Sequence, residues 1–372
     1  MCKVLVSRQA ILNVPNLRFP EFSGEWKKSI LKAECEINPK TGPLADTFQY
    51  IDLESVVKGQ LIKVNYLKKE DAPSRAQRVL SKWDILYQCV RPYQLNNFLV
   101  RDNSSTQRVA STGYAQIRTN NNPDFFFQLL HTQKFTGRVI NRCTGTNYPA
   151  INSTDLSEIE INIPEIKEQE KIGRMLSLID QRIAIQNRLI EKYESLIKAI
   201  AFEIIGRNRS NTTLSDCVFC SSSTLKESEL INTGIPTYGA AGISGYTAEA
   251  LCKSDSILIT KDGSGVGSKR YVHGEHSFVG TLCSLTPKDG IYLPYVYYAL
   301  MIMNLDTYKT GQAIPHIYFK DYGKLQLFCP TYSEQRRLSH GLETLDRKVG
   351  YEESLLLSIN EVKKGLLDQL FI

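Results

Sequence analysis

Apolar residues recur at alternating four- and three-residue intervals in two long segments of this 372-residue chain, with polar residues between them. The first series is Ile172, Leu176, Ile179, Ile183, Gln186, Ile190, Tyr193, Ile197, Ile200 and Ile204. The second series is Leu338, Leu342, Leu345, Val349, Glu352, Leu356, Ile359, Lys363, Leu366 and Leu370. A 4-3 repeat of this length is typical of a coiled-coil seam, and it predicts two helices about 50 Å long at ~1.5 Å rise per residue.

Both predicted helices begin in the same way. A segment of alternating apolar and polar residues ends in a proline, at 156–164 before the first helix and at 322–330 before the second. This alternation predicts a short strand, and the acidic residues that follow favour a helix start. A shift of 166 residues aligns 149–180 with 315–346 without a gap. A repeat of this length indicates a duplicated domain.

The simplest partner expected for each helix is the other helix. A duplicated unit can close about a pseudo-twofold axis, which would set the seams antiparallel and bring Gln186 and Glu352 within about a turn of each other, where a polar pair fixes register. The alternative is that each helix packs on its own domain. The predicted seam contains Ile172, Leu176, Ile179, Ile183, Gln186, Ile190, Leu338, Leu342, Leu345, Val349, Glu352 and Leu356.

The segments that precede the helices share an order of elements but hardly any residues. Strands are predicted from β-branched and aromatic residues at 82–90, 113–118, 256–260, 269–273 and 277–286. An aromatic-rich helix is predicted in each segment, at 123–130 and 293–301. The expected fold is therefore α+β, with two α/β-type recognition domains joined by two long antiparallel helices in a coiled coil with a pseudo-twofold internal repeat.

The predicted boundaries are a lead-in at 1–14, a first recognition domain at 15–164, a first helix at 165–205, a second recognition domain at 206–330, and a second helix at 331–372. We call the two domains head 1 and head 2. Composition is ordinary for a globular protein, with 42% hydrophobic and 23% charged residues. The sequence has no apolar run long enough for a membrane span and no signal-peptide pattern, so a cytoplasmic location is expected.

The net charge of +6 permits a polyanionic partner without requiring one. Arginine, asparagine and glutamine read base edges, while lysine and glycine-loop amides bind phosphates. The residues expected near DNA are Arg91, Arg118, Arg138, Tyr238, Lys261, Lys269, Arg270, Tyr271, Lys309 and Gln312. For each of them a solvated surface position is an equally good interpretation.

No catalytic centre is expected. The glycines at 263–267 lack the G-x-G-x-x-G spacing of a dinucleotide site and precede a predicted strand, so they indicate a hairpin turn. The segment NPDF at 122–125 differs at its third position from the tetrapeptide of amino-methyltransferases, and it is interpreted as a loop entering a helix. Cys217 and Cys220 form a lone C-x-x-C, and the histidines at 273–276 lack a third ligand, so no metal is expected.

The order of head, long helix, head and long helix resembles the specificity subunit of type I restriction-modification systems. The segments that carry the resemblance are PNLRFPEFSGEW at 15–26, IPEIKEQEKIGRMLSLID at 163–180 and CPTYSEQRRLSHGLETLD at 329–346. The junction segments GTNYPAI at 145–151 and GQAIPHI at 311–317 are also similar to that family. The resemblance covers nearly the whole chain.

This resemblance implies a non-catalytic subunit of a site-specific restriction endonuclease and adenine-DNA methyltransferase complex, active in DNA restriction and phage defence. Each head would be a target recognition domain for one part of a split site in double-stranded DNA. The helices would set the spacing and dock two modification (methyltransferase) subunits, to which restriction (translocase-nuclease) subunits are added. S-adenosylmethionine, ATP and magnesium would be used by these partners.

Two other interpretations stay open. In the first, the chain is a coiled-coil adaptor whose heads bind protein and not DNA. In the second, it is a diverged methyltransferase centred on Asn122. Salt dependence separates the first from DNA binding, because each phosphate contact lowers log affinity by about 0.9 per log unit of salt. Methyl transfer by the purified chain alone would favour the second.

Overall fold

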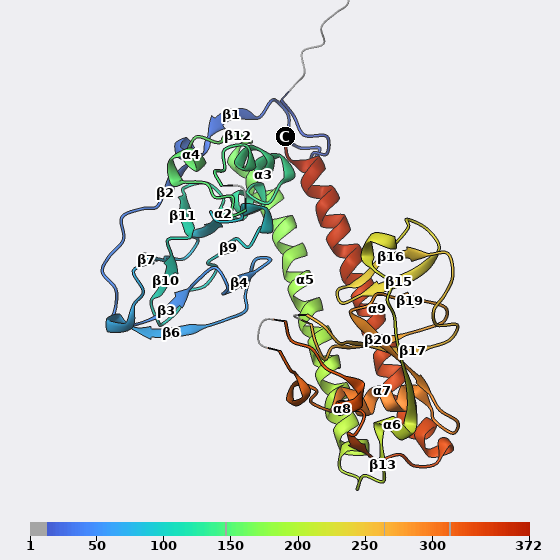
Figure 1. Cartoon of the computed structure of the whole chain (residues 1–372). Coiled ribbons are helices and arrows are strands. Elements are labelled where there is room, and N and C mark those ends of the chain that lie inside the picture. The colour runs from blue at the N-terminus through green and yellow to red at the C-terminus, as the bar shows by residue number, and fades with distance from the viewer. Residues whose placement is uncertain (1–12, 146, 264, 312–313) are drawn as a thin grey trace, which may run out of the picture. The chain divides into compact units, whose positions relative to one another are not determined.

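The computed structural model describes residues 13–145, 147–263, 265–311 and 314–372 (Figure 1). It divides into two compact units, which are residues 1–187 with 355–372, and residues 188–354. We call these unit 1 and unit 2 and describe each by itself. Within the described residues, no helix combines the length and the apolar character that a membrane crossing requires.

Unit 1 contains head 1, which is built from two four-stranded sheets. The first sheet has the order β2-β11-β8-β9 and the second the order β6-β3-β10-β7. The strands are β1 Lys27–Ile30, β2 Cys35–Ile37, β3 Thr47–Ile51, β4 Val56–Val57, β5 Gln60–Leu61, β6 Asn65–Lys68, β7 Ala76–Val79, β8 Ile85–Gln88, β9 Phe98–Leu99, β10 Arg108–Ser111, β11 Tyr114–Thr119 and β12 Glu160–Ile163. The helices are α1 Leu31–Glu34, α2 Pro123–Leu129, α3 Gln133–Ile140 and α4 Ser153–Ser157, with short turns η1 Lys69–Asp71 and η2 Pro92–Gln94.

Unit 2 contains head 2, with sheets of order β14-β20-β17-β18 and β16-β15-β19. Its strands are β13 Thr212–Thr213, β14 Val218–Ser222, β15 Ile235–Gly239, β16 Gly242–Thr247, β17 Ser256–Thr260, β18 Lys269–Val272, β19 Ser277–Phe278, β20 Leu282–Pro287 and β21 Gln326–Leu327. Its helices are α6 Leu214–Cys217, α7 Leu293–Met301 and α8 Phe319–Tyr322, with the π-helical segment η3 Phe202–Gly206 and the 3-10 helices η4 Glu227–Glu229 and η5 Asp306–Tyr308. The long helices are α5 Ile166–Ala201 and α9 Tyr332–Leu370.

The two heads repeat one topology although their residues differ. Strands β2, β11, β8 and β9 occupy the same order as β14, β20, β17 and β18. In each second sheet one pair is parallel, β3 with β10 and β15 with β19. The strand that leads into each long helix has an antiparallel partner. In unit 1, β12 pairs with β1, and in unit 2, β21 pairs with β13. The shared order of elements predicted from sequence is therefore matched by an identical strand order in the first sheet of each head, whereas the second sheets differ in having four and three strands.

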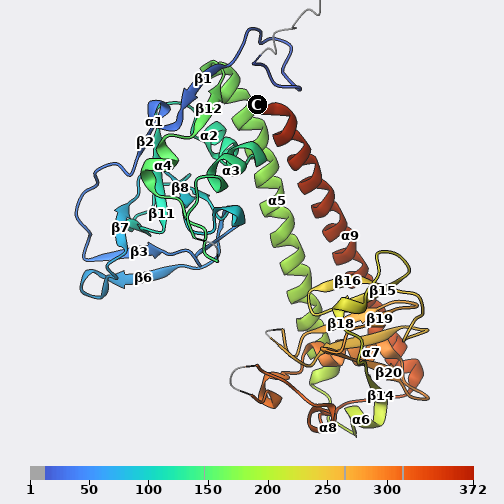
Figure 2. The same cartoon turned by 45° about the horizontal axis from the view of Figure 1, so that its top comes forward.

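The predicted strands and aromatic helices are confirmed. The segments at 82–90, 113–118, 256–260 and 269–273 contain β8, β11, β17 and β18, and the segment at 277–286 contains two strands, β19 and β20. The aromatic helices are α2 and α7. Phe125 and Phe126 of α2 are fully buried in one cluster with Ile172 and Leu176 of α5, and Figure 2 shows α2 and α3 beside the first turns of α5. Hydrophobic burial thus holds head 1 on its helix.

The two long helices pack together in each unit, as the sequence predicts. In unit 1, Ile172 and Leu176 of α5 share a buried cluster with Leu370 of α9, and farther along Asp180 accepts an ion pair from Lys363 at 2.6 Å. Since residue numbers rise along α5 as they fall along α9, the helices are antiparallel there. In unit 2, Ile190 and Ile197 of α5 and Leu342 and Val349 of α9 are buried.

Burial along the predicted seam is uneven. Ile172, Leu176, Gln186, Ile190, Leu342, Val349 and Glu352 are buried, whereas Ile179, Ile183, Leu338, Leu345 and Leu356 are half-buried. The proposed pairing of Gln186 with Glu352 stays a prediction. Within unit 2, Glu352 accepts an ion pair from Lys348 one turn earlier at 2.6 Å.

A buried glutamine ties each head to its long helix. The Gln169 amide donates to the Pro164 carbonyl at 2.9 Å, and its oxygen accepts the N–H of Asn122, the N-cap of α2. Gln335 repeats this contact in unit 2, donating to Pro330 at 2.9 Å and accepting the N–H of Tyr292, the N-cap of α7, at 2.8 Å. Each long helix therefore satisfies an N–H that the head's own helix cannot satisfy.

The acidic residue before each glutamine has a different function in the two units. Glu168 is fully buried and accepts a bidentate ion pair from Arg18 at 2.8 and 2.7 Å. Glu334 is exposed and caps the start of α9 by accepting the N–H of Thr331 at 3.2 Å. Arg18 belongs to the segment 15–26, so this segment contributes an ion pair as well as the buried Trp26 to unit 1.

Candidate nucleic-acid interface

The junction segments at 145–151 and 311–317 are equivalent loops in the two heads. In head 1, Thr144 and Ala150 exchange backbone hydrogen bonds of 2.9 Å, and Gly145 has a φ of +90°. In head 2, Thr310 and His316 exchange the same pair of bonds at 2.9 Å, and Gly311 has a φ of +87°. The described residues at the ends of both loops therefore close with the same geometry.

Each loop is fastened beside the end of a central strand. The Ile151 N–H donates to the Cys89 carbonyl beyond β8, and the Ile317 N–H donates to the Lys261 carbonyl beyond β17. Two residues farther on, Arg91 N–H donates to the Pro149 carbonyl at 2.8 Å, and Gly263 N–H donates to the Pro315 carbonyl at 3.0 Å. These bonds make Arg91 and Gly263 corresponding positions of the two heads.

Large side chains are exposed at the tips of both loops. Tyr148 is 65% exposed and its counterpart Ile314 is 66% exposed. The Arg91 guanidinium lies over the Tyr148 ring, 4.2 Å from its centroid. Directly after the head 2 loop, the amine of Lys320 in α8 lies over the ring of Tyr318, the N-cap of that helix, at 5.2 Å. Cations beside exposed rings provide charge for phosphates and faces for stacking on bases or sugars.

The other two predicted residues of head 1 are engaged within the head. Arg118 makes a bidentate ion pair to Asp84 at 2.7 and 2.8 Å, and the pair raises the pKa of the guanidinium. Asp84 is fully buried and also accepts a hydrogen bond from Gln116 at 2.7 Å. Arg138 donates to the Glu160 carbonyl at 2.6 Å. Their contact with DNA stays a prediction.

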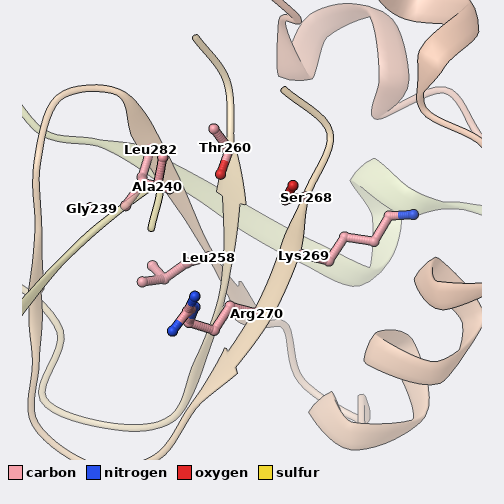
Figure 3. Close-up of a pocket in the computed structure, with 8 residues that line it drawn as sticks. All are labelled: Gly239, Ala240, Leu258, Thr260, Ser268, Lys269, Arg270 and Leu282. Carbon is pink, nitrogen blue, oxygen red and sulfur yellow. The ribbon is translucent and has the colours of Figure 1, made fainter. Parts of the chain in front are cut away.

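Two of the predicted cations of head 2, Lys269 and Arg270, line a small cavity between β15, β17 and β18 (Figure 3). The cavity measures about 40 Å³ and is lined in part by Thr260, Ser268 and Arg270. A small-molecule site typically needs at least ~300 Å³. This hollow is too small for a nucleotide, so any nucleic acid would be bound on the surface of the head.

Arg270 and Lys269 are neighbours in sequence but lie in different environments, and Figure 3 shows their side chains pointing apart. The Arg270 guanidinium lies over the Tyr238 ring, 5.7 Å from its centroid. Lys269 donates to the Met303 carbonyl at 2.7 Å, and burial lowers the pKa of its amine. Arg270 is therefore better placed to meet an external anion than Lys269.

The remaining predicted residues of head 2 differ in their surroundings. The Tyr271 hydroxyl donates to Asp255 at 2.9 Å, and burial raises the pKa of this phenol. Lys309 is paired with Asp306 at 2.6 Å. Lys261 is half-buried beyond β17. Gln312 lies outside the described residues.

The motifs that resemble catalytic sequences have structural functions. The Asn122 side chain accepts the N–H of Phe125 at 2.9 Å and caps α2, so NPDF is a loop entering a helix, as predicted. The glycine segment at 263–267 connects the antiparallel strands β17 and β18, as the hairpin interpretation requires. Among the described residues, no three histidine, cysteine, aspartate or glutamate side chains are grouped as a metal site would need.

Sequence reasoning missed three features of these heads. The glutamine contacts were signalled by the E-Q dipeptide that both repeats carry at 168–169 and 334–335. The contact of Arg91 with Tyr148 had a weaker signal in the sequence than the glutamine contacts had. Only the alignment of the two repeats indicates that residue 148 lies at the tip of a loop. The left-handed backbone of Arg91 had no signal, since this conformation is uncommon for residues other than glycine.

Comparison with known proteins identifies one family model, described as the type I restriction modification DNA specificity domain. The model matches twice, over residues 58–195 and 212–361. The HindI specificity subunit of a type I restriction enzyme from Haemophilus influenzae is 26% identical over 156 residues, which are 41% of this chain and 34% of that protein. A Mycoplasma genitalium protein named as a type I specificity subunit is 28% identical over 251 residues, 61% of this chain and 65% of that protein. The chain thus spans less than two thirds of either relative.

A solved structure has the same fold. The crystal structure of a type I restriction-modification system S subunit from M. genitalium matches with a TM-score of 0.61. The match covers 96% of this chain and 99% of that chain at 20% sequence identity. At this identity the likeness concerns the fold, and it extends over both heads and both long helices.

Proposed function

This chain belongs to the family of the type I restriction modification DNA specificity domain, and on that premise we propose that it is the DNA-reading subunit of a type I restriction-modification enzyme. Head 1, at 15–164, and head 2, at 206–330, would each read one part of a split site in double-stranded DNA. The helices at 165–205 and 331–372 would set the distance between the parts. Heads on one face of B-DNA should then be about one helical turn, ~34–36 Å, apart.

The long helices would also dock the partner subunits. Two modification (methyltransferase) subunits would bind to the helix pair, and restriction (translocase-nuclease) subunits would join that core. S-adenosylmethionine, ATP and magnesium would be bound by those partners, and this chain would contribute recognition alone. The product would be a restriction endonuclease and an adenine-DNA methyltransferase that act at one shared site.

The observation that supports this proposal best is the contrast between a repeated frame and divergent surfaces. The two heads have the same strand order in their first sheets, the same glutamine contact and the same loop closure. Their residues differ at corresponding positions, such as the exposed Tyr148 and Ile314, or the half-buried Arg91 and Gly263. One scaffold with two different surfaces suits a protein that reads two different sequences.

The test uses the full chain co-purified with its modification subunit. Binding to a pool of duplexes with randomised sequence, followed by sequencing of the bound fraction, should recover a motif in two parts separated by an unspecified gap. Binding should also weaken steeply with salt, with a slope near −0.9 per phosphate contacted. A complex that enriches no motif and whose DNA binding is indifferent to salt would favour the protein-binding adaptor instead.

A further inference from the structure

Arg91 has an unusual backbone for its residue type. It adopts φ 53° and ψ 55° immediately before Pro92. Left-handed geometry is uncommon for a residue with a Cβ, and a following proline favours an extended backbone instead. The corresponding residue of head 2 is Gly263, with a φ of +94°, which tolerates this geometry without strain. Head 1 therefore keeps an arginine where the fold favours glycine.

The surrounding structure fixes the backbone of Arg91 in place. Its N–H donates to the Pro149 carbonyl at 2.8 Å, and its carbonyl accepts the N–H of Gln94 at 3.0 Å. Pro92 is buried beside it. Strain of this kind persists where surrounding contacts determine the backbone, and it is often found at functional sites.

The side chain of Arg91 is oriented as well. Its guanidinium lies 4.2 Å from the centroid of the Tyr148 ring, which is itself 65% exposed. The Nε atom is buried without a hydrogen-bond partner, and among the described residues no carboxylate pairs with the guanidinium. Arg118, in contrast, has the Nε–Nη2 edge of its guanidinium occupied by Asp84. Arg91 is thus a cation that lies over an exposed ring and whose outer nitrogens have no partner within the described part of the head.

We infer that Arg91, supported by Tyr148, is a specificity-determining residue of head 1 that hydrogen-bonds the O6 and N7 atoms of a guanine in one part of the DNA site. A planar guanidinium matches these two acceptors in the major groove. A phosphate offers similar acceptors, but a phosphate contact carries no sequence information and should suit both heads alike. The arginine is present in head 1 only, which favours a base. The inference rests on the proposed function.

The experiment compares bound-sequence motifs of the full chain with its modification subunit, using the randomised duplex pool. The variants are Arg91→Lys, which keeps the charge but loses the paired planar donors, and Arg91→Gly, which the backbone accepts most readily. Lys32→Ala, which removes a cation that pairs with Glu158 on the same head, is the control for charge. Melting temperature of each complex is measured in parallel.

The expected result is that both Arg91 variants lose a guanine preference in one part of the motif and keep the other part unchanged, with a melting temperature no lower than that of the parent. Relaxation of the preference by roughly 5- to 150-fold is expected, because one bidentate pair contributes ~1–3 kcal/mol of discrimination and each 1.4 kcal/mol is a factor of ten. Lys32→Ala should keep both parts.

Other outcomes would overturn the inference. Should Arg91→Lys keep both parts of the motif, the contact is to a phosphate or absent. Loss of both parts together, or a lower melting temperature of Arg91→Gly, would mean that the residue supports the head and does not read DNA. If the parent complex enriches no motif at all, the proposed function fails and this inference fails with it.

Discussion

The contact of Gln335 with head 2 leads to a quantitative prediction for Gln335→Ala. This side chain is 1% exposed, donates to Pro330 and Gly290 at 2.9 and 3.2 Å, and accepts the N–H of Tyr292 at 2.8 Å. Truncation removes all three bonds. A net bond contributes ~0.5–1.5 kcal/mol, and a buried group left unpaired costs ~1–3 kcal/mol. We therefore expect local destabilisation of about 2–4 kcal/mol where α7 docks.

Hydrogen exchange measured by mass spectrometry on the full chain tests this value. The peptide that contains Tyr292 should exchange roughly 30- to 700-fold faster, since each 1.4 kcal/mol is a factor of ten. Gln335→Met keeps the volume and removes the hydrogen bonds, so it separates bonding from packing and should give most of the effect. Gln369→Ala, at an exposed position of the same helix, should change exchange little.

The result that would refute this reasoning is unchanged exchange at Tyr292 in Gln335→Ala. It would mean that water replaces the amide at no cost, and that burial of the aromatic residues of α7 alone holds the head. A weaker effect is expected for Gln169→Ala in unit 1, because the bond from Asn122 N–H to Gln169 is longer, at 3.3 Å.

Three further predictions concern charged groups. Lys363→Met should destabilise unit 1 by about 1–3 kcal/mol in urea unfolding, because the partly buried Asp180 loses its ion pair. An unchanged unfolding midpoint would show that water solvates the Asp180 carboxylate as well as Lys363 does. Burial lowers the pKa of His131 to about 4, so stability should be full above pH 6.5 and fall by up to about 3 kcal/mol as the pH drops from 6.5 to 4. His131→Asn should reduce that slope, and an identical slope would contradict the assignment. Arg270→Ala should weaken DNA binding about tenfold in fluorescence anisotropy, while subunit assembly measured by gel filtration stays intact. An unchanged affinity would mean that DNA does not contact the surface around Arg270 and Tyr238.

The sequence predicted the frame because helix burial is periodic. Apolar residues at 4-3 spacing define one face of a helix wherever the helix lies, so α5 and α9 could be identified from spacing alone. The aromatic helices α2 and α7 were equally visible, since an asparagine or proline start and consecutive aromatic residues leave few other structures. Duplication then indicated that the two halves share one fold.

The candidate interface depended more on tertiary structure. Arg91 and Arg118 have the same residue type, so sequence alone does not distinguish them. In the folded protein Arg118 pairs with a buried aspartate, whereas Arg91 lies over a ring from a distant loop. Glu168 and Glu334 occupy the same place in the repeat, but only Glu168 is buried against an arginine. Local spacing determines which residues share a helix face. Contacts between residues far apart in the chain decide which charged side chains remain available for a partner. These contacts exist only once the chain has folded.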